Sequence, residues 1–261
     1  MRTPLSAIAL LTLFACDDGD GTDTDIDTDT DTGTEMGTEV ETTDVSGNVT
    51  DAQGNALSGV RVNMCRQVCL TATTDEAGDY VFDGGLVAQR YSFHIETLGD
   101  LSQVDGSVPY TVEDTDAVVL DVIVPTATPI AIPSARAEVE PAADLLLTVG
   151  AGDLTILFED DPTEIAAVRV GMDEVMPIDI EGDIAAVWYL DPWSADADPA
   201  VGLRIRDTFG ASGDTYTLFQ ANYDDAAWDT LGTLTSDGDF VTGDIALSRL
   251  DTLVLVSESA R

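Results

Sequence analysis

The sequence offers few of the side chains that carry out nucleophilic catalysis. Such catalysis needs a base, most often a histidine, within reach of a serine or cysteine, and the chain has one histidine, His94. His94 alternates with Phe93 and Ile95 in a segment that has the pattern of a β-strand. We therefore interpret it as a structural or surface histidine. No Gly-x-Ser-x-Gly motif and no phosphate-binding glycine loop occurs in the sequence.

Paired carboxylates are a second route to catalysis, because two acids that flank a glycosidic bond can hydrolyse it. The chain has 50 acidic residues, so two of them can lie close together without any catalytic role. A general acid also needs a pKa raised by burial, and no acidic residue lies within a long apolar run. We expect that the protein is not an enzyme, and keep a carboxylate-based hydrolase as an alternative.

Trp193 is the most loop-like of the three tryptophans, set between Asp191 and Asp196. An exposed tryptophan can stack on a sugar ring or anchor a protein interface, so Trp193 is a candidate ligand contact. A place in the core or a role in pinning the loop is the simpler interpretation. Trp188 shares strand parity with Leu190, and we expect it in the core.

Calcium is the one cofactor that the acidic composition suggests. Aspartates in predicted loops, such as Asp237 and Asp239, could supply oxygen ligands, although Asp-Gly pairs are also ordinary turn residues. Asp27-x-Asp29-x-Asp31 resembles the start of an EF-hand loop, but Gly33 comes one position too late for that motif. We predict no other cofactor, and no metal-ligating residues.

The overall charge excludes two classes of partner. The formal net charge is −40, and all ten basic residues are arginine. Such a protein repels nucleic-acid phosphates and anionic lipid head groups. We therefore expect neither nucleic acid nor the membrane surface itself as a partner.

The N-terminus has the pattern of an export signal. Arg2 is followed by an apolar run from Leu5 to Ala15, which is too short to cross a bilayer as a helix. Leu13-Phe14-Ala15-Cys16 resembles the lipobox of bacterial lipoproteins. That resemblance implies cleavage before Cys16 and acylation of its thiol, as with palmitate, so that the membrane is reached through the lipid anchor only. The alternative is an ordinary secretory signal cut near Ala15.

Cys65 and Cys69 are the other two cysteines. Export implies an oxidising compartment, where an even pair favours a disulfide over a zinc or redox site. The alternating strand up to Cys65, a three-residue loop and a returning strand from Leu70 predict a β-hairpin with the two cysteines opposite each other. Two reduced, core-facing cysteines are the alternative.

The segment after Cys16 changes character twice. Up to Asp44 it is rich in Asp-Thr repeats and almost devoid of apolar residues, which predicts a disordered spacer. From Val45 onward, short alternating segments separated by Gly, Asp and Pro turns predict strands throughout. Only Ala137–Leu147 could hold a helical turn.

The first group of strands contains the pattern Val45-x-Gly47-x-Val49-x-Asp51-x-x-Gly54-x-x-Leu57-x-Gly59-Val60-x-Val62, followed by Thr74-Asp75-x-x-Gly78-x-Tyr80-x-Phe82. This pattern resembles the carboxypeptidase regulatory-like domain, whose fold is a transthyretin-like β-sandwich. The resemblance implies a fold and no enzymatic activity.

We thus predict an all-β protein with two antiparallel β-sandwich domains. Residues 1–15 form the lipoprotein signal peptide, 16–44 the lipidated, disordered linker, 45–125 the transthyretin-like sandwich, and 126–261 a second sandwich or barrel. The expected function is non-catalytic binding or structural support in the cell envelope, at the outer membrane or cell surface. A carbohydrate-binding accessory protein is the main alternative. The partner would be a surface glycan or a protein.

Overall fold

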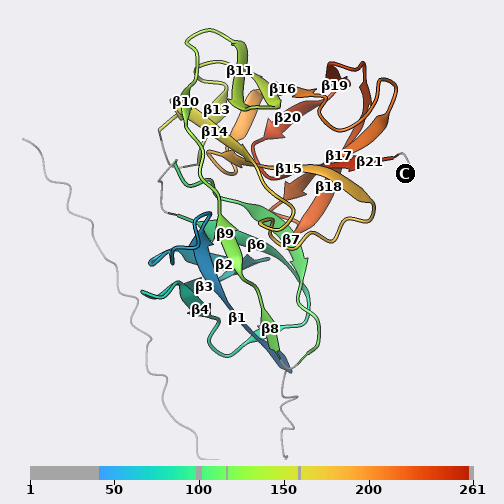
Figure 1. The fold of residues 1–261 in the computed structure, drawn as a ribbon. Helices are drawn as coiled ribbons and strands as arrows, with labels where there is room; N and C mark the ends of the chain where they lie inside the picture. The colour runs from blue at the N-terminus through green and yellow to red at the C-terminus, as the bar shows by residue number, and fades with distance from the viewer. Residues whose placement is uncertain (1–40, 98–101, 116, 158–159, 259–261) are drawn as a thin grey trace, which may run out of the picture. The chain divides into compact units, whose positions relative to one another are not determined.

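The computed structural model describes residues 41–97, 102–115, 117–157 and 160–258 (Figure 1). The predicted signal peptide, Cys16 and the predicted linker as far as residue 40 lie outside these residues. The described part of the chain is built of strands and turns, without a helix, as the alternating sequence predicted. No helix in this part is long and apolar enough to cross a membrane.

Residues 42–124 form two sheets that face each other across an apolar core. The five-stranded sheet consists of β1 (Thr42–Asp51), β4 (Asp79–Val81), β5 (Leu86–Val87), β8 (Ala117–Val119) and β9 (Val122–Val124). The four-stranded sheet has the order β3 (Cys69–Thr73), β2 (Arg61–Cys65), β6 (Arg90–Glu96) and β7 (Ser107–Thr111). This is the β-sandwich that the sequence predicted.

Strand β1 organises the five-stranded sheet, since all four of its partners pair with it. It begins at Thr42, before the predicted start at Val45, because Thr42 and Thr43 pair with Val87 and Leu86. Its pairings with β8 and β9 are parallel, whereas every other ladder among the described residues is antiparallel.

Residues 130–257 form one twelve-stranded sheet. Along its main path the order is β10 (Ile130–Ala131), β14 (Glu164–Arg169), β15 (Asp183–Asp191), β21 (Leu253–Ser257), β17 (Thr215–Asn222), β18 (Ala227–Ser236), β19 (Phe240–Thr242), β16 (Asp196–Arg206), β12 (Leu145–Val149) and β11 (Ala137–Ala142). Strands β13 (Leu154–Thr155) and β20 (Ala246–Arg249) also pair with β16. Because β11 also contacts β14, the sheet nearly closes into a barrel.

Ala137–Leu147 is not helical, so the expectation of a helical turn there was wrong. The segment contains β11 and the start of β12, which pair as a hairpin with a register shift between Val139 and Ala142. The Ala-Glu-Val-Glu sequence of β11 alternates with period two, and Pro141 falls inside the irregular part of the ladder.

Strands β15 and β21 join the two halves of the described chain, because both are buried on two faces. Trp188 and Leu255 belong to the apolar cluster inside the twelve-stranded sheet. Their neighbours Tyr189 and Val254 face the other way and join the cluster that fills the first sandwich. This two-sided burial explains why these strands are apolar at successive positions. It also fixes the end of β15 against the first sandwich.

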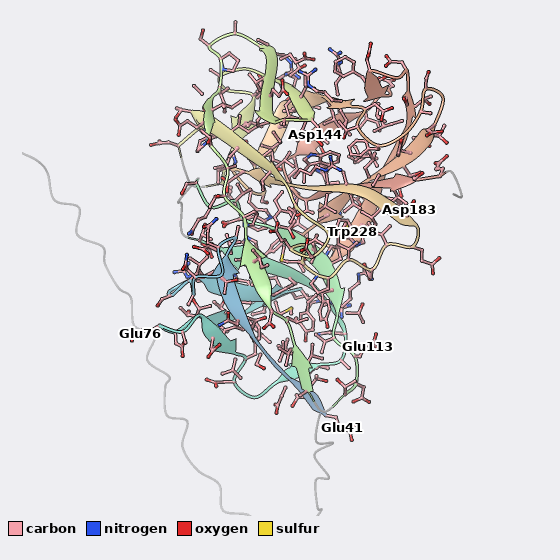
Figure 2. The ribbon with its side chains drawn as sticks, viewed as in Figure 1. Glu41, Glu76, Glu113, Asp144, Asp183 and Trp228 are labelled. Carbon is pink, nitrogen blue, oxygen red and sulfur yellow. A yellow bond between two sulfur atoms is a disulfide. The ribbon has the colours of Figure 1, made fainter. Side chains whose placement is uncertain are left out.

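Acidic side chains cover the surface, as the net charge implied. Figure 2 shows Glu76, Glu113 and Asp183 at the rim of the described structure, and all three are exposed. Mutual repulsion at such a surface disfavours compaction, so the stability of the fold depends on the two apolar clusters.

Candidate functional site

A cleft of about 700 Å³ lies where the first sandwich meets the twelve-stranded sheet. Its walls come from β6, from the segment before β7, and from the loops that follow β13, β15 and β17. Its ionisable side chains include six acids, and no arginine among the described residues lines it. The acids are Glu96, Asp105, Asp160, Asp161, Glu164 and Asp191.

The loop after β15 carries Trp193 into this cleft. Strand β15 ends at Asp191, and the next residue, Pro192, has no N–H to continue a ladder. The loop is then anchored to the segment before β21, since Ser194 N–H donates to the Leu250 carbonyl at 2.8 Å and Leu250 N–H donates to the Ala195 carbonyl at 2.8 Å. Trp193 is therefore held on a fixed loop.

Three aromatic rings form one wall of the cleft. The rings of His94 and Trp193 stack with centroids 3.7 Å apart and planes 16° apart. Tyr223 stands nearly perpendicular to both, with its centroid 4.8 Å from that of Trp193 and 6.0 Å from that of His94. These separations form a right triangle with its right angle at Trp193. Tyr223 thus lies beside the indole ring, and neither ring covers the indole face opposite His94.

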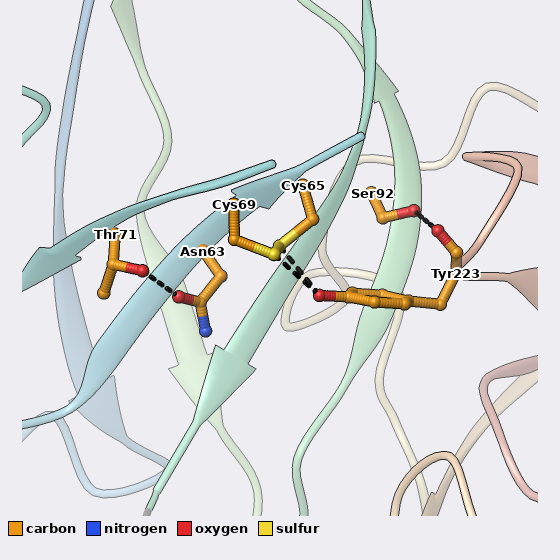
Figure 3. The surroundings of a disulfide bond; sticks show 6 residues. All are labelled: Asn63, Cys65, Cys69, Thr71, Ser92 and Tyr223. Carbon is orange, nitrogen blue, oxygen red and sulfur yellow. Dashed lines mark hydrogen bonds between the residues drawn. A yellow bond between two sulfur atoms is a disulfide. The ribbon is translucent and has the colours of Figure 1, made fainter. Parts of the chain in front are cut away.

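The disulfide Cys65–Cys69 holds Tyr223 in place (Figure 3). The Tyr223 hydroxyl donates to Cys65 Sγ at 2.8 Å and lies 3.1 Å from Cys69 Sγ. Ser92 Oγ donates to the Tyr223 backbone carbonyl from the adjacent strand. The hairpin of the first sandwich therefore fixes a residue of the second half at the edge of the cleft.

Asp105 and Asp191 are two buried carboxylates on the same cleft. Thr97 holds Asp105, donating to its Oδ1 from the backbone N–H at 3.0 Å and from its hydroxyl at 2.7 Å. The backbone amide of Asp105 lowers the pKa of Asp191, against the effect of burial. Burial raises the pKa of Asp105 to about 7, with a further rise from the charge of Asp191, and burial raises the pKa of Asp191 to about 6.

Four buried side-chain atoms lie beside the cleft without a hydrogen-bond partner. They are His94 Nε2, Ser107 Oγ, Trp193 Nε1 and Asp251 Oδ2. Burial raises the pKa of Asp251 to about 8 and lowers that of His94 to about 3. The Trp193 N–H lowers the pKa of Asp251 slightly, at a geometry outside that of a hydrogen bond. Buried polar groups are nearly always paired, so this group of atoms distinguishes the site.

The cysteine and tryptophan predictions can be compared with the structure. Cys65 and Cys69 are register partners at the tip of the β2–β3 hairpin and form the predicted disulfide. Trp188 is fully buried, as predicted. Trp193 is half-buried, pins its loop against His94 and also lines the cleft. Cys16, predicted to carry lipid, lies outside the described residues.

The calcium prediction stays a prediction. In the part of the chain that the structure describes, no group of three or more His, Cys, Asp or Glu side chains is placed to hold a metal ion. Asp237 accepts backbone hydrogen bonds from Asp239 and Phe240 at 2.9 and 2.7 Å, which is the turn role named as the alternative.

No acidic residue lies in an apolar run long enough to predict a pKa raised by burial, yet burial raises the pKa values of Asp105, Asp191 and Asp251. Asp191 directly follows the apolar strand Ile184–Leu190, and this position could have signalled its burial. Asp251 lies between Leu250 and the apolar strand β21, which is a similar signal. Asp105 lies in a polar stretch, so its local sequence does not signal burial. Its burial comes from contact with the other half of the chain.

Comparison with protein families identifies part of the chain. Residues 44–124 match the carboxypeptidase regulatory-like domain. This match confirms the resemblance predicted from the spaced glycines and turns. No curated protein matches the chain significantly.

Three solved structures resemble the chain weakly. A streptococcal ancillary pilin is 14% identical, with 85% of this chain and 55% of that chain covered and a TM-score of 0.27. A DUF3823 family protein of Parabacteroides merdae is 10% identical, with coverages of 85% and 83% and a TM-score of 0.25. A candidate carbohydrate binding protein of Bacteroides uniformis is 11% identical, with coverages of 82% and 79% and a TM-score of 0.24. This chain thus spans about half of the pilin.

Proposed function

We propose that this chain, whose residues 44–124 match the carboxypeptidase regulatory-like domain, is a cell-envelope protein that binds a glycan without hydrolysing it. In this proposal Cys16 carries the lipid that anchors the protein at the outer membrane or cell surface. The acidic segment after Cys16 serves as a spacer. The ligand occupies the cleft beside Trp193.

The observation that carries this proposal is the face of the Trp193 indole that neither His94 nor Tyr223 covers, on a residue that lines the cleft. One face of the indole lies on His94, and Tyr223 lies at its edge, so the ring is held rigidly with its other face unoccupied by either. The apolar face of a sugar ring stacks on such a surface, and a rigid aromatic contact loses little conformational entropy on binding. The surrounding carboxylates can accept hydrogen bonds from sugar hydroxyls.

The polar groups near the cleft do not support nucleophilic catalysis. Ser107 is the register partner of His94, but neither Ser107 Oγ nor His94 Nε2 has a hydrogen-bond partner. With a pKa of about 3, His94 is also a weak base at neutral pH. Its close stack on Trp193 fits a structural support for the binding surface.

A glycan array probed with the full chain tests the proposal. We expect specific hits that Trp193→Ala abolishes and that Trp193→Phe, which keeps an aromatic face, weakens less. Circular dichroism of both variants shows whether they are folded. Hits that are equally strong with folded Trp193→Ala would refute the proposed site.

A carboxylate-based hydrolase is the second candidate. The observation that favours it is the pair Asp105 and Asp191, both buried on an open cleft with raised pKa values near 7 and 6, since a protonated acid beside an ionised one is the requirement for glycoside hydrolysis. Incubating each array hit with the chain and measuring new reducing ends decides between the two functions. Release that Asp191→Asn abolishes would make the protein an enzyme.

A further inference from the structure

Two buried carboxylates of the cleft, Asp105 and Asp191, have no cationic partner among the described residues. Elsewhere, Asp144 is paired with Arg169 at 2.9 Å and Asp153 with Arg136 at 2.8 Å. Among residues 41–258, apart from the short gaps in the description, no ion pair reaches Asp105 or Asp191, although both are more than nine-tenths buried. Of the four buried acids in the described chain, the fold thus pairs Asp144 with an arginine and leaves Asp105, Asp191 and the fully buried Asp251 without an ion pair.

Two buried carboxylates on the same cleft, with no counter-charge, are energetically unfavourable unless one is protonated or a cation binds between them. A buried charge without a partner is costly, and two like charges raise that cost. Asp105 accepts two hydrogen bonds from Thr97, which orient its carboxylate but do not cancel its charge. A positively charged ligand group in the cleft would supply the counter-charge that the protein itself does not provide.

The surroundings favour an organic cation over a metal ion. No described group of acids and histidines is arranged to hold a metal, whereas Trp193, with one face covered by neither His94 nor Tyr223, lies two residues after Asp191. His94 contributes an unpartnered Nε2 to the same wall while being 2% exposed. An ammonium group has three N–H donors, and the two carboxylates are acceptors.

We infer that the cleft recognises a sugar with a free amino group, whose ring lies on Trp193 and whose ammonium lies between Asp105 and Asp191. The inference rests on the proposed glycan-binding function and names its substrate class. A ring is favoured over a lysine side chain because a flat face matches the indole, while a single methylene chain covers little of it. Acetylation of the amine would remove its charge and two of its three donors.

Titration calorimetry with three matched sugars tests this inference on the full chain. Glucosamine, glucose and N-acetylglucosamine share a ring and differ in one substituent, which is an ammonium, a hydroxyl or an amide. We expect glucosamine to bind at least about tenfold more tightly than the other two, a ratio that corresponds to about 1.4 kcal/mol. Lysine amide, which has the cation without the ring, should bind at least about tenfold more weakly than glucosamine.

Variants locate the effect. Asp105→Asn and Asp191→Asn should each remove most of the preference for glucosamine over glucose. Asp83→Asn, an exposed aspartate in the turn before β5, lowers the net negative charge equally and should leave the preference unchanged. A preference that Asp83→Asn reduces as much as the cleft variants would mean attraction by overall charge and would overturn the inference.

The failure of this inference can be told from failure of the proposed function. Equal binding of the three sugars, lost in Trp193→Ala, would refute the role of the ammonium and leave glycan binding in the cleft standing. Binding of lysine amide without any sugar would refute both. Absence of binding by all four compounds, with array hits that depend on Trp193, would overturn only the assignment of the amino sugar.

Discussion

Replacing Asp105 with asparagine should stabilise the protein at alkaline pH. Asp105 is 9% exposed, and burial, with the nearby charge of Asp191, raises its pKa from 3.8 to about 7. Between these two pKa values the folded state holds a proton that the unfolded state has released. The free energy of unfolding therefore falls as the pH rises through this window. Asparagine is neutral and keeps an oxygen that can accept from Thr97, so it removes this loss.

The size of the effect follows from the width of the window. About two pH units of it lie between pH 5 and the folded-state pKa, and each unit corresponds to about 1.4 kcal/mol. This gives a ceiling of about 3 kcal/mol, from which the coupling to Asp191 and the added amide N–H groups subtract. We expect the stabilisation by Asp105→Asn at pH 8 to exceed its value at pH 5 by about 2 kcal/mol.

Urea denaturation of the full chain at pH 5 and pH 8 measures this difference. Asp144→Asn is the matched control, because Asp144 is also buried but accepts from Arg169 and from Trp188, both at 2.9 Å. It should destabilise the fold at both pH values, by about 1–3 kcal/mol. If Asp105→Asn behaved like Asp144→Asn, or if its effect were the same at both pH values, Asp105 would not be an uncompensated buried acid.

Three other predictions concern the rest of the chain. Gly47→Ala should lower the free energy of unfolding, measured by thermal denaturation, by about 3 kcal/mol. The reason is that an added Cβ would meet the Leu120 carbonyl oxygen at 2.0 Å. A loss below about 1 kcal/mol would contradict the close packing of these strands. Denatured, unreduced protein should show no free thiol from Cys65 or Cys69, and replacing both with serine should lower the free energy of unfolding by about 2 kcal/mol for so short a loop. Mass spectrometry of the mature protein should find Cys16 at the N-terminus with acyl chains, and an unmodified N-terminus at another residue would exclude the lipoprotein.

Local patterns were sufficient to predict most of the fold. The alternation before Cys65 and after Cys69 predicted the hairpin and its disulfide, because hairpin register follows from loop length. The glycine and turn spacing from Val45 resembles that of the carboxypeptidase regulatory-like domain, and this resemblance implied the first sandwich. No local sequence pattern predicted the parallel pairing of β8 and β9 with β1, because parallel partners are joined by long connections and not by a tight turn.

The cleft could be predicted only in part. Trp193 was recognisable from its loop setting, but its stack on His94 brings together residues 99 positions apart, one on the loop after β15 and the other on β6. The burial of Asp105 likewise comes from the packing of the two halves, and no local pattern in its polar surroundings signals it. Tyr223 reaches the cleft edge through its hydrogen bonds to the disulfide. These are tertiary contacts, which propensity and periodicity do not encode.

The central claim is that a glycan lies on the uncovered face of Trp193. The most direct measurement is fluorine NMR of the full chain with 5-fluorotryptophan at its three tryptophans, with the Trp193 resonance identified by its loss in Trp193→Phe. On titration with glucosamine, the account predicts that the Trp193 resonance shifts in a saturable way while that of Trp188, which is fully buried, stays in place. A saturable shift at Trp228 alone, or binding detected by calorimetry without any shift at Trp193, would contradict it.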